Sequence, residues 1–344
     1  MKSVQIDSKL IGDEFPCYVI AEIGNLFKNF EEAKRLIDSA LEMKIDAIKF
    51  QTWDAETLTT KNNLFDLQVT GNVSQYDFHK NLQISQELQF DIVEYARKKN
   101  LTIFSAPSHM DDVDLMEKMD LPAFKIGSDL ACHIPLLKRV AKFHKPIILS
   151  TGMCSMDEIK KSVTSIFNEG NEQLILLHCI SDYPTKIEES NLNAIIEMKK
   201  EFSIPIGFSD HSVGSLVSLS AATMGSNVIE KHLKHPQNSS SPDDIHALTP
   251  EQFSELIKSI KLVELSKGSG EKIPSMSEQK NLITNRVSII AMNEIKKGTK
   301  ITSDLIDIRR PGTGIMPYYY EDVLLKKAKL DISKETPLTW DMLE

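Results

Sequence analysis

Cysteine is scarce in this chain, and the four cysteines among its 344 residues are scattered. No Cys-x-x-Cys pair is present, which favours buried, unreactive thiols in a reducing compartment. Apolar runs are short, whereas a membrane-spanning helix needs ~18 consecutive apolar residues. Charges such as Asp7 and Lys9 interrupt the first residues, unlike the apolar stretch of a signal peptide. We therefore expect a cytoplasmic protein that does not enter a membrane.

Positive charge is in the minority. The 40 Lys and Arg residues face 49 Asp and Glu residues, which gives a formal net charge of −9. A nucleic-acid partner would favour a basic surface, so the balance argues against one. A local cluster of lysines could still bind a small anionic substrate. The 41% hydrophobic and 26% charged residues are typical of a globular protein and exclude a disordered chain.

Short apolar runs alternate with amphipathic segments along most of the chain. Eight runs have the composition of strands buried on both faces, as a parallel sheet requires: 18–23, 47–50, 102–106, 123–126, 146–150, 174–178, 205–209 and 228–232. Helical spacing follows several of them, for example in 33–41, 192–198 and 253–263. No glycine-rich GxGxxG turn follows the first run, as it would in many doubly wound sheets. The pattern predicts an α/β protein with a (β/α)8 TIM barrel.

Changes in composition divide the chain. We expect a barrel domain over residues 1–265, a linker over 266–285 that begins with Ser-Lys-Gly-Ser-Gly, and a small β-rich domain over 286–344. The polar insertion 52–86 follows the second predicted strand and is a candidate lid or subunit contact.

Two histidines close the last predicted strands. His211 follows the seventh strand and His232 ends the eighth. Ends of neighbouring strands converge in a barrel, so the two imidazoles could share a divalent cation such as Mn²⁺, Fe²⁺, Co²⁺ or Zn²⁺. The alternative is two hydrogen-bonded histidines without a metal. His178 is either a third ligand or a core residue, the latter being favoured. Sequence pattern assigns no role to the remaining histidines, His79, His109, His133, His144, His235 and His246.

Lysines and a glutamate end other strands on the same rim. Lys49 and Lys125, with Ser150 and Ser209 nearby, could form a pocket for a phosphate or carboxylate. They could equally neutralise acidic residues of the rim, or one of them could form a Schiff base as in a class I aldolase. Glu22 follows apolar residues and is a candidate general acid–base, or else a salt-bridge partner of a lysine.

Taken together, these motifs resemble those of the sialic acid synthase family, which condenses phosphoenolpyruvate with amino sugars. The matching segments are Ala-Glu-Ile-Gly at 21–24, Lys-Phe-Gln at 49–51, Phe-Lys-Ile-Gly-Ser at 124–128, Leu-Ser-Thr-Gly-Met at 149–153, Leu-His-Cys at 177–179, Tyr-Pro-Thr at 183–185, Gly-Phe-Ser-Asp-His-Ser at 207–212, Ile-Glu-Lys-His at 229–232 and Ser-Pro-Asp at 241–243. The tail segment 309–315 resembles the family's antifreeze-like SAF domain, a small β-clip.

The resemblance implies a domain-swapped homodimer and a set of site residues. It implies that phosphoenolpyruvate is bound by Lys49, Gln51, Lys125, Ser128, Ser150 and Ser209. Tyr183 and Asp243 would line the sugar site, and Arg310 would reach it from the partner subunit. His211 and His232 would bind the divalent ion, with Mn²⁺ expected first and Mg²⁺ or Co²⁺ as alternatives. Glu22 would be the catalytic acid–base. The product would be a sialic-acid-like nonulosonic acid, with phosphate released by C–O cleavage.

The sequence departs from the family on the side of the acceptor sugar. Leu26 and Phe27 replace Asn-His, Leu130 replaces a glutamate that grips sugar hydroxyls, Ala106 replaces a threonine and Ser181 an asparagine. These changes predict a more apolar acceptor site, and hence a deoxygenated or otherwise modified hexose rather than N-acetylmannosamine. A Schiff-base aldolase or lyase and a non-catalytic sugar-binding homologue are the alternative functions.

Overall fold

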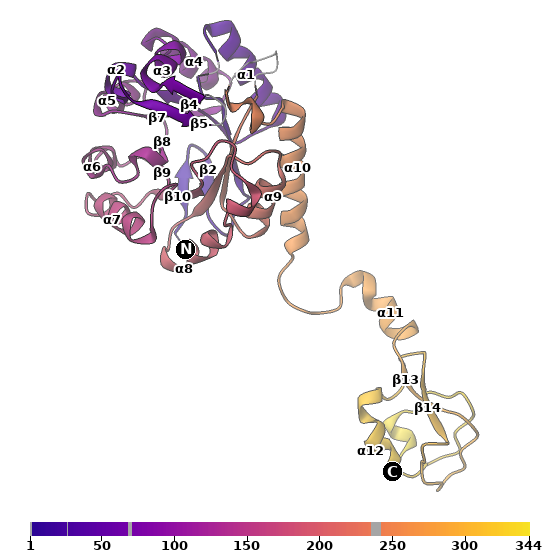
Figure 1. Cartoon of the computed structure of the whole chain (residues 1–344). Helices are drawn as coiled ribbons and strands as arrows, with labels where there is room; N and C mark the ends of the chain where they lie inside the picture. The colour runs from indigo at the N-terminus through magenta and orange to yellow at the C-terminus, as the bar shows by residue number, and fades with distance from the viewer. Residues whose placement is uncertain (1, 26, 68–70, 235–241) are drawn as a thin grey trace. The chain divides into compact units, whose positions relative to one another are not determined.

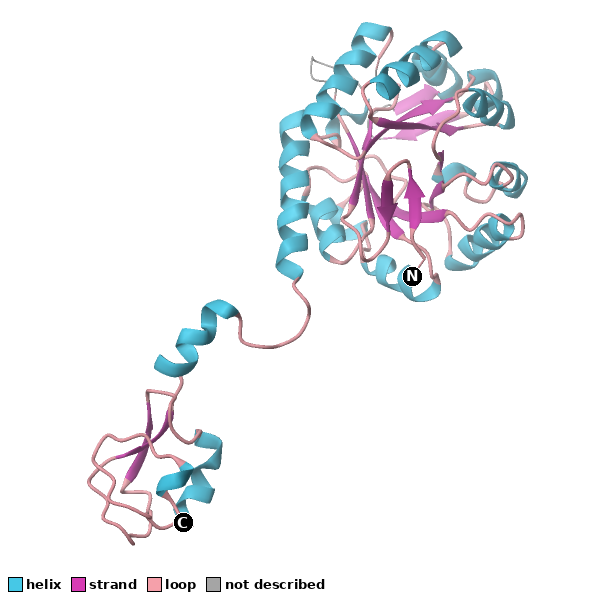
Figure 2. Ribbon diagram, turned by 180° about the vertical axis from the view of Figure 1, so that it is seen from behind, coloured by secondary structure: helices cyan, strands magenta, loops and turns pink. Residues whose placement is uncertain are grey.

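Eight parallel strands close into a barrel, which confirms the predicted fold class (Figures 1 and 2). The computed structural model describes residues 2–25, 27–67, 71–234 and 242–344. The barrel strands follow one another in chain order: β3 (Tyr18–Glu22), β4 (Ala47–Thr52), β7 (Thr102–Pro107), β8 (Phe124–Ile126), β9 (Ile147–Ser150), β10 (Leu174–Cys179), β11 (Ile206–Asp210) and β12 (Val228–His232). All eight are buried almost throughout, as the apolar runs predict.

A helix follows each barrel strand and covers the outside of the barrel. These helices are α1 (Phe30–Met43), α4 (Gln86–Lys98), α5 (Met110–Lys118), α6 (Ile134–Ala141), α7 (Met156–Phe167), α8 (Asn193–Glu201), α9 (Leu216–Thr223) and α10 (Pro250–Lys267). Thr249 caps α10, since its hydroxyl accepts the Gln252 backbone N–H at 3.3 Å while the Gln252 side chain accepts the Thr249 N–H at 2.9 Å. Among the described residues, no helix is long and apolar enough to span a membrane.

A short hairpin closes the end of the barrel where the strands begin. Its strands are β1 (Val4–Ile6) and β2 (Lys9–Ile11), paired antiparallel. Val4, Ile6 and Ile11 pack in one cluster with the first residues of several barrel strands. The carboxyl ends of the strands therefore remain as the open end, where TIM-barrel sites lie.

Gly207 lies on β11 in close contact with its neighbours β10 and β12. A Cβ atom added there would lie 2.5 Å from the Val228 carbonyl oxygen and 2.6 Å from Leu177 Cδ2. Backbone atoms of a neighbouring strand cannot move without cost, so Gly207→Ala should destabilise the fold by about 1–3 kcal/mol. We expect the Tm to fall by several degrees in a thermal unfolding experiment followed by circular dichroism. Gly12→Ala is the control, because its Cβ would meet Ser3 at an ordinary 3.5 Å; equal Tm values for both variants would contradict the prediction.

The insertion after β4 folds into elements of its own. These are α2 (Ala55–Leu58), the antiparallel pair β5 (Leu64–Leu67) and β6 (Gly71–Ser74), and α3 (Gln75–Leu82). Side chains of Phe65, Phe78 and His79 contact one another edge-on or tilted, and Trp53 packs against His79. The insertion thus carries an aromatic cluster, although its sequence is largely polar.

The chain divides into two compact units, Met1–Gly268 and Ser269–Glu344. The second unit begins with two short helices, η4 (Met276–Glu278) and α11 (Gln279–Thr284). It then forms the antiparallel pair β13 (Ser288–Ala291) and β14 (Ile306–Arg309), followed by η5 (Pro317–Tyr319), α12 (Tyr320–Leu324) and η6 (Trp340–Met342). It has its own apolar core, built mainly from isoleucines such as Ile289, Ile306 and Ile332.

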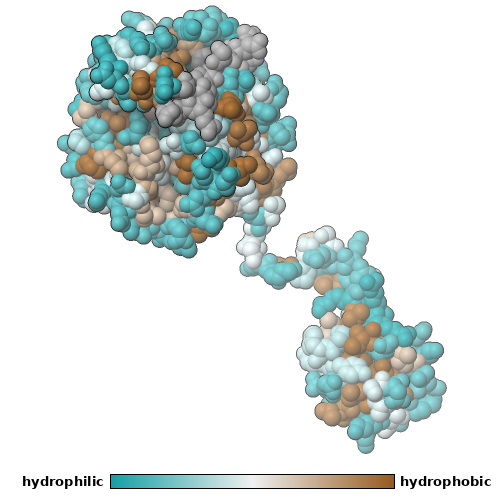
Figure 3. All heavy atoms as spheres, in the orientation of Figure 1, coloured by the Kyte–Doolittle hydropathy of each residue, from teal (hydrophilic) through white to brown (hydrophobic). Residues whose placement is uncertain are grey.

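On the face shown in Figure 3, the surface is largely hydrophilic with scattered apolar patches.

Candidate active site

A cavity of about 690 Å³ opens at the carboxyl ends of the barrel strands. Of the predicted barrel residues, the following line it: Lys49, Gln51, Lys125, Ser128, Ser150, Tyr183, Ser209, His211, His232 and Asp243. Glu22 lies behind this lining and contacts Lys49. The strand ends therefore bring the predicted set together, because residues at the ends of parallel barrel strands converge on one opening.

Lys49, Lys125 and Glu230 are buried residues that line the floor of the cavity, and Glu22 pairs with Lys49 behind it. Lys49 Nζ lies 2.6 Å from Glu22 Oε2 and 3.7 Å from Glu230 Oε1. Lys125 Nζ lies 3.4 Å from the same Glu230 oxygen and donates a hydrogen bond of 2.7 Å to Ser150 Oγ. The lysines thus pair with acidic residues of the rim, one of the alternatives that the sequence left open, and they also line the cavity.

Charge pairing dominates the ionisation of this floor. Burial acts to raise the pKa of Glu230, but Lys125, Lys49 and the Ser209 hydrogen bond outweigh it and hold that pKa at about 2. Burial likewise acts to lower the pKa of Lys49, yet Glu22 and Glu230 raise it above its usual value. For Lys125 burial prevails and lowers the pKa, although Glu230 opposes the shift. Lys49 therefore stays protonated at neutral pH and is a fixed positive charge.

Glu230 is a site residue to which sequence pattern alone gave no role. It precedes His232 by two positions on β12, so both side chains point to the same face of the strand. Ser209 pairs with it in the strand register and donates a hydrogen bond of 2.9 Å to Glu230 Oε1. Lys231 lies between Glu230 and His232 in the strand and points to the opposite face. Its Nζ atom lies 3.1 Å from Asp210 Oδ2, and both side chains are fully buried. This alternation is the signal that could have identified Glu230.

Glu22 is held in a fixed orientation at the end of β3. Its Oε1 atom accepts the Gly24 backbone N–H at 2.8 Å and the Gln51 side-chain amide at 3.3 Å. Its other oxygen pairs with Lys49, so the predicted salt bridge is present. The predicted Ser128 also contributes through its oxygen, which accepts the Gly152 backbone N–H at 3.0 Å.

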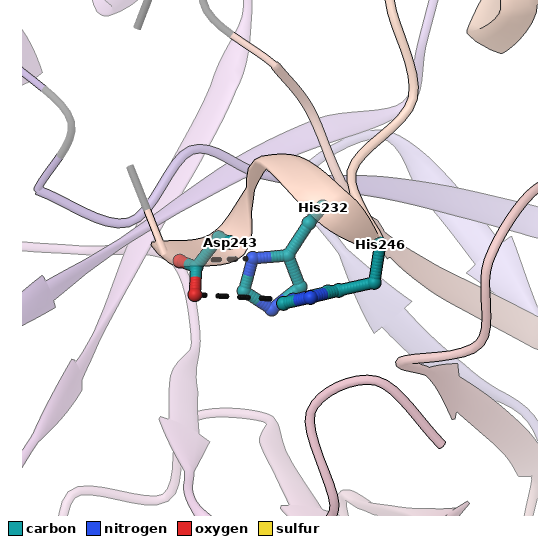
Figure 4. Close-up of side chains that lie close together, drawn as sticks. All are labelled: His232, Asp243 and His246. Carbon is teal, nitrogen blue, oxygen red and sulfur yellow. Dashed lines mark ion pairs between the residues drawn. The ribbon is translucent and has the colours of Figure 1, made fainter. Parts of the chain in front are cut away.

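Three imidazoles and a carboxylate gather beside this floor. The ring centroids of His211 and His232 lie 5.5 Å apart, and those of His232 and His246 lie 4.6 Å apart. Asp243 Oδ2 lies 3.4 Å from His232 Nδ1, and its Oδ1 lies 3.8 Å from His246 Nε2 (Figure 4). The Tyr183 ring packs on His211 with centroids 4.2 Å apart. The sequence assigned no role to His246, and this arrangement corrects that assignment.

The cluster has the donor groups that a divalent transition metal requires. His211 Nδ1 donates to the Ile180 carbonyl at 2.8 Å, so its Nε2 atom carries a free lone pair. Burial lowers the pKa of His211. Burial, aided by His232, lowers the pKa of His246 to about 3, which keeps this imidazole neutral. Neutral imidazoles with a carboxylate suit Mn²⁺, Fe²⁺, Co²⁺ or Zn²⁺ better than Mg²⁺, which prefers an all-oxygen shell.

His178 is a core residue in the structure. Its Nε2 atom lies 2.9 Å from the Ser190 carbonyl oxygen, and its ring packs on Phe208 with centroids 5.6 Å apart. Of the two sequence interpretations, the structure therefore supports packing rather than ligation.

The apolar replacements near the acceptor site do not all lie where the resemblance placed them. Phe27 is only 1% exposed and belongs to the core cluster, against which Leu130 also packs. Neither lines the cavity, whereas Ala106 and Ser181 do. Leu26, like His235 and Ser241, lies outside the described residues. The expectation that Phe27 and Leu130 make the acceptor site apolar is therefore wrong, because Phe27 lies in the core, Leu130 packs against it while partly exposed, and neither lines the cavity.

The insertion after β4 supplies the apolar wall of the cavity instead. The apolar side chains that it contributes are Trp53, Leu58, Leu64, Phe65, Phe78 and Leu82. Met153 adds to them from the loop after β9. A wall of this kind can pack against methyl groups, and a floor that contains lysines can bind anionic groups.

Comparison with known proteins agrees with this geometry. A model of the NeuB family matches residues 36–272, and one of the SAF domain matches residues 286–344. An uncharacterized protein of Methanocaldococcus jannaschii is 39% identical over 100% of this chain and 99% of its own length. N,N'-diacetyllegionaminic acid synthase of Legionella pneumophila is 32% identical over 97% of this chain and 96% of its own.

A solved structure gives the same result. The N-acetylneuraminic acid (sialic acid) synthetase of Leptospira borgpetersenii, in complex with citrate, superposes with a TM-score of 0.74 at 28% identity. The match covers 82% of this chain and 95% of the synthetase. With the barrel, the lysine-lined cavity and the C-terminal SAF domain, these matches lead to one conclusion: the chain belongs to the NeuB family and is an enzyme of the sialic acid synthase type.

Proposed function

We propose that this enzyme condenses phosphoenolpyruvate with an N-acylated hexosamine, giving a sialic-acid-like nonulosonic acid and phosphate. One observation carries the proposal: two buried lysines and a histidine–carboxylate cluster line the same cavity. The lysines suit a substrate that bears a phosphate and a carboxylate, and the cluster suits a divalent ion, with Mn²⁺ the first choice.

The residues of the cavity can be assigned to steps of this reaction. Lys49 and Lys125, supported by Ser150, Ser209, Gln51 and Ser128, bind the anionic groups of phosphoenolpyruvate. A divalent ion held by His211 and His232 would supply Lewis acidity toward the sugar aldehyde. As C3 of phosphoenolpyruvate forms a bond to the aldehyde carbon, the aldehyde oxygen takes up a proton and C2 becomes electron-poor. Glu22 would take a proton from the water that adds at C2.

Phosphate then leaves by cleavage of its bond to C2, which forms the keto group of the product. Lys49 and Lys125 stabilise the charge on the departing phosphate. In this scheme one water is consumed and one phosphate released for each sugar. Lys49 acts as a fixed charge, which disfavours it as a Schiff-base lysine, since that chemistry requires a neutral amine.

Tyr183 and Asp243 are proposed to line the sugar site, and the apolar wall favours a 2,4-diacetamido-2,4,6-trideoxyhexose over N-acetylmannosamine. The 32%-identical Legionella relative is named for the diacetylated product legionaminic acid, which supports this choice. We further propose that the enzyme is a cytoplasmic, domain-swapped homodimer in which Arg310, a residue of the C-terminal unit, reaches the partner's sugar site.

Phosphate release from phosphoenolpyruvate in the presence of Mn²⁺ tests the proposal. We expect release with a 2,4-diacetamido-trideoxyhexose of the manno or altro series, less with N-acetylmannosamine and none without sugar. A chelator should abolish it, and added Mn²⁺ should restore it. Turnover of N-acetylmannosamine alone would overturn the acceptor assignment. A reducible adduct after borohydride treatment with a keto substrate would instead identify a Schiff-base enzyme.

A further inference from the structure

His246 is a buried imidazole whose hydrogen-bonding groups are not satisfied by the described protein. The residue is fully buried, and neither Nδ1 nor Nε2 has a hydrogen-bond partner. A buried polar group without a partner costs free energy, so an arrangement of this kind requires an explanation. An imidazole in its neutral form carries a lone pair on one ring nitrogen, and that nitrogen can bind a metal ion.

The place of His246 in the fold directs it toward the histidine cluster. It follows the short helix η3 (Pro242–Ile245), which begins after β12 and precedes α10. Its backbone N–H donates to the Asp243 carbonyl at 3.1 Å, which anchors the residue to that turn. The close-up in Figure 4 shows the His246 ring beside the His232 ring, with the Asp243 carboxylate directed at both.

The distances suit a single ion. One possible ligand atom from each of His232, Asp243 and His246 lies within 4.8 Å of the others. Metal–nitrogen bonds of ~2.1 Å place two ligand atoms on one ion roughly 3–4 Å apart, so small side-chain rotations would close the site. The ring centroid of His211 lies 6.0 Å from that of His246 and 5.5 Å from that of His232, so a third imidazole lies beside this group.

We propose that His246 binds the catalytic divalent ion directly, together with His232 and Asp243, so that His246 and Asp243 add two protein ligands to the pair His211 and His232. The inference rests on the proposed function only for the identity of the ion as the catalytic one. A nitrogen-rich centre of this kind should retain its ion more tightly than two histidines can. It should also prefer Co²⁺, Fe²⁺ or Zn²⁺ to Mg²⁺.

Binding of Co²⁺ to the full-length protein tests this assignment without any assay of activity. The dissociation constant is measured by competition with a chromophoric chelator, and the visible d–d spectrum reports the ligand set. We expect His246→Ala to weaken Co²⁺ binding by more than the about 10–100-fold typical of outer-shell residues, and to change the spectrum. His246→Cys, which keeps a ligand atom, should recover part of the affinity. His178→Gln is the matched control, because His178 is a buried histidine outside the cluster and should leave the affinity unchanged.

Unchanged Co²⁺ affinity and spectrum in folded His246→Ala would overturn the assignment. If the variants do not fold, pulsed EPR of Mn²⁺ bound to the wild-type protein counts the coordinated imidazoles directly. Three are expected, and two would overturn the proposal. If His246→Ala loses Co²⁺ affinity and the wild-type enzyme releases no phosphate with any sugar, the metal site stands and the proposed function is rejected. The two failures are therefore distinguishable.

Discussion

Lys125→Met is expected to reduce sugar-dependent phosphate release by about 10²–10³-fold, the loss typical of removing one group that stabilises developing charge. Lys125 is almost fully buried, and its ammonium group donates to Ser150 and faces Glu230. Methionine preserves much of the side-chain volume but removes the charge. Because the lysine contacts both bound and departing phosphate in the proposed reaction, kcat and kcat/KM should fall together.

Steady-state kinetics of purified variants provide the measurement. Lys186→Met is the matched control, since Lys186 is 58% exposed and pairs with Glu189 outside the cavity. A Lys125→Met enzyme that folds normally and keeps more than a tenth of wild-type activity would remove Lys125 from the phosphate site. A rise in KM alone would restrict its role to binding.

Glu230→Gln is expected to cause the largest loss of stability, about 3–5 kcal/mol, because it leaves two buried ammonium groups with less compensating charge. The carboxylate lies between Lys49 and Lys125, and all three side chains are buried. In a domain of this size the loss corresponds to a fall in Tm of roughly 10 °C. Glu172→Gln is the control. Glu172 is 63% exposed and its partner Lys2 is 60% exposed, so this ion pair should contribute little to the free energy of unfolding.

The difference in stability between wild type and Glu230→Gln should decrease at acidic pH. Glu230 has an ordinary pKa of 4.5 and is held at about 2 in the folded protein. The unfolded chain therefore takes up a proton first as the pH falls, and the stabilisation by the carboxylate is lost between those values. The stability gap between wild type and Glu230→Gln should be constant above pH 5 and narrow as the pH falls toward 2. A gap that widens in acid would contradict the charge arrangement.

Much of the barrel was predictable because its signals are local. Strands buried on both faces are continuous apolar runs, and the cap of α10 shows as Thr249 followed by Pro250. The site residues followed from a rule about the fold: strand ends in a TIM barrel converge, so Lys49, Lys125 and His232 had to meet.

The remaining features depend on contacts that no local pattern reveals. Whether Phe27 points into the core or into the cavity depends on the path of a loop, and in the structure its side chain lies in the core. His246 lies in a turn, where a histidine is usually exposed, and only the fold brings it to His232. The aromatic cluster of the insertion was hidden by the polar residues around it.

The hairpin β1–β2 depends for its burial on strands that come much later in the chain. Its apolar side chains pack with residues of β10 and β12, which the ribosome makes much later. During synthesis, Val4, Ile6 and Ile11 therefore lack their packing partners until β12 has been made and the barrel has closed. The hairpin is translated before the barrel strands but is among the last segments to be buried, so chaperone contacts on the nascent chain are best sought there.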